Sequence, residues 1–268
     1  VTFYTAQFYV LFFLTQMLKM DPAQANTLLI ISVVIGAPFF IFFGWLSDRV
    51  GRKPILMMGL LLATVLYFPL FKALSHYANP QIDAASRQSP IVVMADPSTC
   101  TFQFDPVGKA RFDSPCDKVK TFLVKQGLPY TSVSAAPGTP VQVSVGEQQI
   151  QGFDEAAMRA AISAAGYPAK ADPSAVNQPM VVLVMVMLTL IATMTYGPLA
   201  AVMVELFPTR IRYTSMSLPY HIGNGWFGGF LPTVSFALVV YTGDIFYGLW
   251  YPVLITGVSL VVGMLCLK

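Results

Sequence analysis

The chain has 268 residues, of which 55% are hydrophobic and 11% are charged, and its formal net charge is +3. Soluble domains carry about 25% charged residues, so this composition excludes an ordinary soluble protein and indicates a membrane protein. The excess of bases is small, and most bases lie at the ends of apolar segments, which favours a role in membrane orientation over a nucleic-acid surface. We therefore expect the lipid bilayer as a partner and no nucleic acid.

Six apolar segments are long enough to cross a bilayer, which takes about 20 residues. In chain order they cover residues 2–20, 24–46, 54–75, 179–204, 215–240 and 245–267. They predict an all-α membrane protein with six transmembrane helices, three in residues 1–75 and three in residues 179–268. The first segment lacks the basic start and cleavage site of a signal peptide. Because the chain begins inside an apolar helix at Val1, we expect a fragment of a longer protein.

The most informative polar segment separates the second and third apolar segments. Residues 44–54 read Gly-Trp-Leu-Ser-Asp-Arg-Val-Gly-Arg-Lys-Pro. Each charge would cost about 3 kcal/mol in hydrocarbon, so this segment is a loop at a membrane surface. The bases alone fit a cytoplasmic loop of any multispanning protein. They do not explain the spacing of Gly44, Asp48 and Gly51, where glycines allow a tight reversal and an acid can pair with an arginine.

This loop resembles the signature loop of the major facilitator superfamily, which joins the second and third helices of each half. The resemblance implies a latch that holds one conformation. Its expected members in this loop are Gly44, Asp48, Arg49, Gly51 and Arg52.

A second motif, Glu-Leu-Phe-Pro-Thr-Arg-Ile-Arg over residues 205–212, closes the fourth apolar segment. It resembles an element that follows the tenth helix in sugar-porter-like and metabolite–proton symporter members. It adds Glu205, Arg210 and Arg212 to the expected latch, and either arginine could pair with Glu205. The alternative is a plain helix end, with Pro208 as the stop and the arginines as cytoplasmic anchors.

The order of the two motifs matches helices seven to twelve of a facilitator, its C-terminal half. Residues 3–9 and 213–225 resemble the metabolite–proton symporter branch, and the resemblance covers the apolar segments but not residues 76–178. It implies a secondary active transporter that moves a small organic acid or zwitterionic metabolite by alternating access, coupled to protons. The expected partners are this substrate, protons and a missing N-terminal six-helix half. No carboxylate lies within the apolar segments away from their ends, so we expect the essential acid in the missing half.

The distribution of bases predicts the orientation. If the residue 48–53 loop is cytoplasmic, alternation places most bases flanking the spans on that side, and only Lys19 and Lys72 at the outer ends. The cytoplasmic bases are Arg49, Arg52, Lys53, Arg210, Arg212 and Lys268. We therefore expect a multi-pass protein of the cell (inner) membrane with residues 76–178 outside the cytoplasm.

Residues 76–178 form an insert with the pattern of a small α+β domain. Residues 141–145 and 148–151 predict a hairpin, and residues 117–126 and 154–165 carry helix start and stop signals. Cys100 and Cys116 both lie here, and a disulfide between them fits a small domain in an oxidising compartment. A metal pair is the alternative, but the cysteines lack metal-ligand spacing, so we expect no metal and no cofactor.

Polar side chains within apolar segments are candidates for a substrate pathway, because they are costly in hydrocarbon. The candidates are Tyr4, Gln7, Tyr196, Tyr220, His221 and Asn224. The alternative for each is hydrogen bonding between helices, worth about 0.6 kcal/mol. His221 can titrate near neutral pH, although a structural histidine fits equally well. A kink or break is expected at Gly197-Pro198.

Two other function classes remain open. A transporter-like membrane sensor would use the insert to bind a ligand, and pH-dependent substrate uptake would distinguish it from a transporter. An enzyme tethered to the membrane would need a catalytic pattern in the insert. The insert has no Ser-His-Asp, metal or phosphate-cradle pattern, so we expect no enzyme and no catalytic residues.

Overall fold

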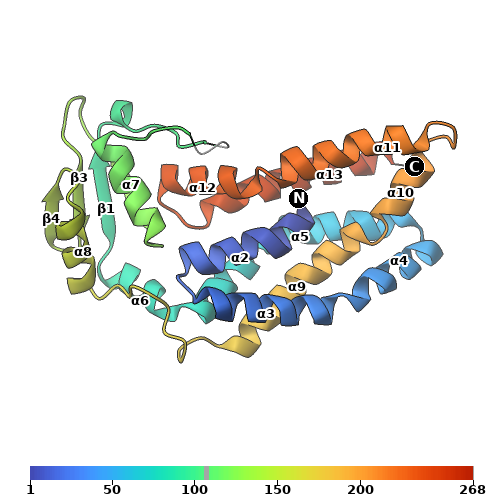
Figure 1. Cartoon of the computed structure of the whole chain (residues 1–268), viewed down its shortest axis with the longest axis horizontal. Helices are drawn as coiled ribbons and strands as arrows, with labels where there is room; N and C mark the ends of the chain where they lie inside the picture. Colours follow the sequence, from blue (N-terminus) through green and yellow to red (C-terminus); the bar gives the residue numbers. More distant parts are fainter. Residues whose placement is uncertain (106–108, 268) are drawn as a thin grey trace.

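The structure, a computed structural model, describes residues 1–105 and 109–267 and is mostly helical with one small sheet (Figure 1). Among the described residues, five helices are long and apolar enough to cross a membrane, judged by length and composition. They are Pro22–Val50, Arg52–Ala78, Gln178–Leu206, Arg212–Thr242 and Tyr247–Cys266. Lys268, expected among the cytoplasmic bases, and residues 106–108 of the insert lie outside the described residues.

The first helix is shorter than the expected span of residues 2–20 and contains two π-helical turns. It consists of α1 (Thr2–Tyr4), the π-helical η1 (Thr5–Tyr9), α2 (Val10–Phe12) and the π-helical η2 (Phe13–Met17). The chain then turns, because Lys19 has a left-handed backbone with φ of 54°. The helix that ends at Met17 is therefore not among the five candidate spans.

The next two spans run in opposite directions. The first contains α3 (Pro22–Gly36) and α4 (Pro38–Val50), and the second is α5 (Arg52–Ala78). Asp21 caps α3, since its Oδ2 accepts hydrogen bonds from the amides of Ala23 and Gln24 at 3.1 Å each. The two spans are separated by a single residue, Gly51, so the signature loop is a sharp reversal between two helices.

Three further spans complete the helical region. They contain α9 (Gln178–Tyr196), α10 (Leu199–Leu206), α11 (Arg212–His221), the π-helical η4 (Ile222–Gly228), α12 (Leu231–Thr242), the 3₁₀ turn η5 (Tyr247–Leu249) and α13 (Trp250–Cys266). The regular helix stops at Tyr196 and resumes at Leu199, where the break at Gly197-Pro198 was expected. Small residues bring α9 close to α3 and α5: a Cβ on Gly36 would lie 2.4 Å from Thr189, and one on Gly59 would lie 2.7 Å from Thr195.

Residues 79–176, which we call the sheet unit, lie between the second and third candidate spans. They contain α6 (Pro80–Gln88), β1 (Ile91–Ala95), the 3₁₀ turn η3 (Pro97–Thr99), α7 (Pro115–Lys125), β2 (Thr131–Ser134), β3 (Gln142–Val145), β4 (Gln148–Gln151) and α8 (Glu155–Ala164). The strand order is β2-β1-β3-β4; β1 is parallel to β2 and antiparallel to β3, and β3 is antiparallel to β4. Figure 1 places this unit at the opposite end of the molecule from the α4–α5 connection and α10.

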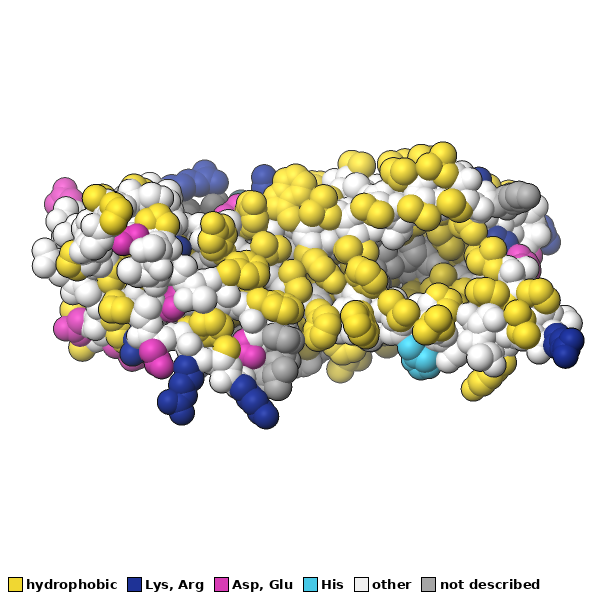
Figure 2. Space-filling view, turned by 90° about the horizontal axis from the view of Figure 1, so that it is seen from above, with side chains coloured by type: hydrophobic (Ala, Val, Ile, Leu, Met, Phe, Trp, Pro, Cys, Tyr) yellow, Lys and Arg dark blue, Asp and Glu magenta, His cyan; other side chains and the backbone are white. Residues whose placement is uncertain are grey.

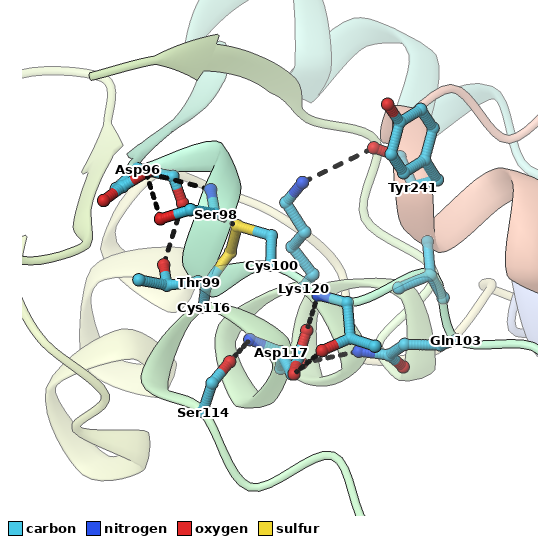
Figure 3. The surroundings of a disulfide bond; sticks show 12 residues. Asp96, Ser98, Thr99, Cys100, Gln103, Ser114, Cys116, Asp117, Lys120 and Tyr241 are labelled. Carbon is cyan, nitrogen blue, oxygen red and sulfur yellow. Dashed lines mark hydrogen bonds between the residues drawn. A yellow bond between two sulfur atoms is a disulfide. The ribbon is translucent and has the colours of Figure 1, made fainter. Parts of the chain in front are cut away.

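A disulfide fixes the long segment after β1 (Figure 3). It joins Cys100 to Cys116, the pair named from the sequence, with their Cα atoms 5.4 Å apart. Cys116 is buried at the start of α7, and Cys100 is half-buried. The neighbouring Asp117 holds the same segment, because its Oδ1 accepts a hydrogen bond from the amide of Thr101 at 2.8 Å and its backbone oxygen accepts one from Gln103 at 3.2 Å.

The sheet unit is attached to the end of α12. The backbone amide of Tyr130 donates to the carbonyl oxygen of Gly243 at 3.0 Å, and its hydroxyl donates to that of Val240. Lys120 Nζ donates to the carbonyl oxygen of Tyr241 at 3.4 Å (Figure 3). Burial at this contact lowers the pKa of the Lys120 ammonium below its ordinary value.

The same unit is attached to the end of the first helix. The amide of Ala171 donates to the carbonyl oxygen of Lys19 at 3.0 Å, and Asn79 Nδ2 donates to that of Leu18 at 2.9 Å. Gly127, with φ of 72°, lies so close to Met17 that a Cβ would come within 2.2 Å of its carbonyl oxygen. The sheet unit thus connects two helices that are far apart in the sequence.

The surface divides into an apolar middle and two charged ends. In Figure 2 hydrophobic side chains cover most of the helical region, whereas lysine, arginine and acidic side chains gather at the sheet unit and at the opposite end. Ile41 on α4 is 78% exposed and Leu265 on α13 is 80% exposed. Exposed apolar surface of this extent is typical of helices that face lipid or another protein.

Candidate functional site

Arg52 is the centre of an ionic cluster at the end of the molecule opposite the sheet unit. Its Nη1 lies 2.5 Å from Asp48 Oδ1 at the end of α4, and its Nε lies 2.7 Å from Glu205 Oε1 on α10. The Arg52 side chain is 25% exposed, Asp48 62% and Glu205 56%. One guanidinium therefore links the two sequence motifs, which are separated by about 150 residues.

The other charged residues of the expected latch have different partners. Arg49 stacks on the Trp45 ring, with its guanidinium carbon 4.1 Å from the ring centre. Arg212 Nε donates to the backbone oxygen of Phe207 at 3.1 Å. Arg210 is exposed and makes no hydrogen bond or ion pair with the described residues. The structure therefore pairs Glu205 with Arg52, and neither Arg210 nor Arg212 pairs with it.

The two glycines of the signature loop differ in what the backbone requires of them. Gly51 has φ of 95° and ψ of 151°, a conformation that a side chain would disfavour, and it lets α5 begin directly after α4 ends. Gly44 lies beside the break between α9 and α10, where a Cβ on Gly197 would be 3.3 Å from the Gly44 amide nitrogen. A Cβ on Gly44 itself would meet nothing within 4 Å, so the reversal needs Gly51, whereas the close approach depends on Gly197 and not on Gly44.

Five of the six expected cavity residues lie near the first helix and η4. Each of the five contacts either another helix or another residue of the set. Gln7 Nε2 donates to Thr189 Oγ1 on α9 at 3.4 Å, a long hydrogen bond. The Tyr196 hydroxyl donates to Asn224 Oδ1 at 3.1 Å, and Tyr220 lies near enough to Tyr196 to interact with it. The Tyr4 ring packs against Gly228 of η4. The sixth residue, His221, is exposed and has its ring centre 5.8 Å from that of Tyr220.

Both candidate amides lie in π-helical turns, which the sequence did not reveal. Gln7 belongs to η1 and Asn224 to η4, and both side chains are partly exposed. A π-helical turn inserts one residue into the helix and occurs frequently at functional sites. The glycines of η4 gave some signal for irregular backbone, whereas the first helix gave none.

The described spans offer few groups that could carry a proton. Their only carboxylates are Asp48 and Glu205, and both belong to the Arg52 cluster. Among the described residues, no group of three or more histidine, cysteine or acidic side chains could hold a metal ion. The arrangement can therefore hold helix ends together and present uncharged polar groups to a small molecule.

Comparison with known proteins finds a matching family over the first part of the chain. Residues 1–85 match the family model of the Major Facilitator Superfamily. This range contains the signature loop, Gln7 and Arg52. It covers about a third of the chain and supports a membrane transporter of that superfamily.

One curated protein resembles a shorter stretch. The citrate-proton symporter of Klebsiella pneumoniae is 37% identical over 65 residues, which are 24% of this chain and 15% of the symporter. The matched stretch thus spans less than a sixth of the symporter's length. No solved structure matches the chain.

Proposed function

We propose that the chain is part of a secondary active transporter that moves a small organic acid across the membrane together with protons. The observation that carries the proposal is the match of residues 1–85 to a transporter family over the segment that contains Gln7 and Arg52. Citrate is the first substrate to test, because the similar curated protein is a citrate-proton symporter. The finer assignment, the C-terminal half of a metabolite–proton symporter, rests on the order of the two motifs.

The proposed substrate pathway runs along the first helix and η4. Gln7 and Asn224 are hydrogen-bond donors and acceptors within the helical region, and their present partners can be exchanged for substrate oxygens. The long contact from Gln7 to Thr189 is the weaker of the two and the easier to replace. These helices would line the cavity between this half and the missing half.

The proposed latch is the Arg52 cluster. It joins α4 and α5 to α10 in the described conformation, so it favours that conformation over any in which α10 moves away. The cluster would lie at the cytoplasmic face and the sheet unit outside the cytoplasm. The base asymmetry and the opposite positions of the two in Figure 1 support this placement.

Citrate uptake into liposomes tests the proposal. The full-length protein that contains this chain is reconstituted, and labelled citrate is supplied outside with the lumen more alkaline than the medium. We expect uptake that disappears when a protonophore collapses the gradient. Uptake that is unaffected by the gradient would contradict proton coupling. Binding without any uptake of organic acids would favour a sensor.

Gln7 provides the test of the pathway. We expect Gln7→Leu to reduce uptake at least tenfold, because a substrate oxygen loses its donor, whereas Gln16→Leu leaves uptake unchanged. Gln16 is an exposed amide on the same helix, and its side chain makes no hydrogen bond with the described residues. Equal uptake by the two variants, at equal amounts in the membrane, would show that Gln7 serves packing alone.

A further inference from the structure

A crevice lies where the sheet unit meets the ends of the helices. Its volume is about 390 Å³, and its walls come from the last turns of α5, from α6 and from residues 244–246 between α12 and η5. This volume is in the usual range for small-molecule sites. The crevice shares no residue with the Arg52 cluster or with the candidate cavity residues, so it is a separate place in the molecule.

One face of α5 supplies the polar wall of the crevice. Lys72, Ser75 and His76 line it and stand at positions i, i+3 and i+4, which share a helix face. Lys72 and His76 are exposed, whereas Ser75 is only 9% exposed. The Ser75 hydroxyl has no hydrogen-bond partner among the described residues, although it lines the crevice. A hydroxyl can both donate and accept a hydrogen bond, so this group is available to a molecule in the crevice.

The charge of the crevice favours an anion. Lys72 and His76 from α5 and Arg87 from α6 are its basic residues, and Arg87 also interacts elsewhere. The acid on the opposite wall, Asp244, is engaged in its own turn, because its Oδ1 accepts a hydrogen bond from the amide of Phe246 at 2.8 Å. Positive groups therefore exceed negative ones among these lining residues.

Most of the remaining lining residues are apolar. Ile82 and Ile245 are buried, Phe246 and Pro129 lie beside them, and Ser86 completes the lining. A basic wall beside an apolar wall suits a molecule that carries an anionic oxygen group on a short hydrocarbon body. A bare divalent cation does not fit, because such ions prefer several oxygen ligands and Asp244 is the one carboxylate among these lining residues, beside Lys72 and Arg87.

We propose that this crevice is a binding site for the carboxylate or phosphate group of a small anion. Lys72 supplies the charge, and the Ser75 hydroxyl and the His76 ring supply hydrogen bonds. The proposal does not depend on the transport function, because none of the candidate cavity residues lines the crevice. A soluble organic acid and the headgroup of an anionic lipid share this chemistry, and the crevice lies at the end of a candidate span.

Histidine NMR provides a local probe, since the chain has only two histidines. The full-length protein is labelled on its histidine rings and placed in phosphatidylcholine nanodiscs, and the signal of His76 is assigned from a His221→Gln variant. Citrate and inorganic phosphate are then added, with chloride at matched ionic strength as the reference. We expect both anions, and not chloride, to shift the His76 signal in a saturable way.

Two variants and a control locate the binding. We expect the half-saturating anion concentration to rise at least tenfold in Lys72→Gln and several-fold in Ser75→Ala. Lys170→Gln removes the same charge from an exposed lysine that does not line the crevice, and it should change nothing. A His76 shift that appears only when phosphatidylglycerol is included would assign the site to a lipid headgroup.

Three results would overturn the proposal. The first is an unchanged His76 signal with every anion and lipid. The second is an equal shift with chloride, and the third is equal half-saturation in Lys72→Gln and Lys170→Gln.

Discussion

The link between Arg52 and Glu205 makes a quantitative prediction. At 2.7 Å, two unit charges attract each other by about 1.5 kcal/mol in water. Both side chains are partly exposed, and measured pairs of this kind contribute about 0.2–1 kcal/mol. We therefore expect the pair to favour the linked conformation by about 0.5–1 kcal/mol, a factor of roughly two to five in population.

A double-mutant cycle measures this contribution. Arg52→Gln, Glu205→Gln and the double variant are unfolded by titration with a denaturing detergent, and the coupling free energy is taken from the four midpoints. Glu205→Gln leaves Arg52 paired with Asp48, so it removes only the contact between helices. We expect coupling of about 0.5–1 kcal/mol at low salt and a smaller value at 1 M salt, where the Debye length falls to about 3 Å.

A control cycle uses Arg210→Gln with Glu205→Gln. Arg210 has no partner among the described residues, so its coupling to Glu205 should be near zero. If Arg210 couples to Glu205 more strongly than Arg52 does, or if Arg52 and Glu205 show no coupling at low salt, the Arg52 link is not the contact that joins the two motifs.

The remaining predictions concern the latch and the sheet unit. Asp48→Ala should lower transport while leaving membrane insertion intact, and wild-type uptake kinetics in that variant would count against the latch. Replacing Cys100 and Cys116 by alanine should destabilise the sheet unit by about 3 kcal/mol, because the bond closes a loop over a separation of 16 residues; an unchanged thermal midpoint would contradict this. After reduction, an impermeant thiol reagent added to intact cells should label these cysteines, and failure to do so, with reactive denatured controls, would place the unit in the cytoplasm. Gly127→Ala should lower the melting temperature more than Gly152→Ala: both have a left-handed φ, 72° and 74°, but a Cβ meets a backbone oxygen only at Gly127, so equal losses would refute the steric argument.

Several elements of the sheet unit could be predicted from sequence because their signals are local. The expected helix over residues 117–126 is Pro115–Lys125, and the expected hairpin strands are Gln142–Val145 and Gln148–Gln151. Capping residues explain the accuracy at the helix start, where the Ser114 hydroxyl accepts a hydrogen bond from the Asp117 amide at 3.0 Å. Strands β1 and β2 were missed, since their pairing depends on chain that lies about 40 residues away.

The sequence named the residues of the candidate site but not the contacts that they make. The charged motifs pointed to an ionic cluster, but a pair such as Arg52 and Glu205 depends on how α5 and α10 pack, which periodicity does not determine. The π-helical turns at Gln7 and Asn224 were also invisible, because they replace one regular hydrogen-bond pattern by another without a characteristic residue. Tertiary packing decides both features.

The attachment of the sheet unit to α12 has a consequence for biosynthesis. Tyr130 binds a backbone oxygen that enters the chain 110 residues later. At about 5–20 residues per second, this delay is roughly 5–20 seconds. During that time the unit can form its sheet and pack against the end of the first helix, while the surface that later contacts α12 stays exposed. The nascent protein therefore passes through a stage in which Tyr130 and Lys120 are accessible to chaperones, proteases or neighbouring copies. This stage ends when Val240 has been synthesised and contacts Tyr130.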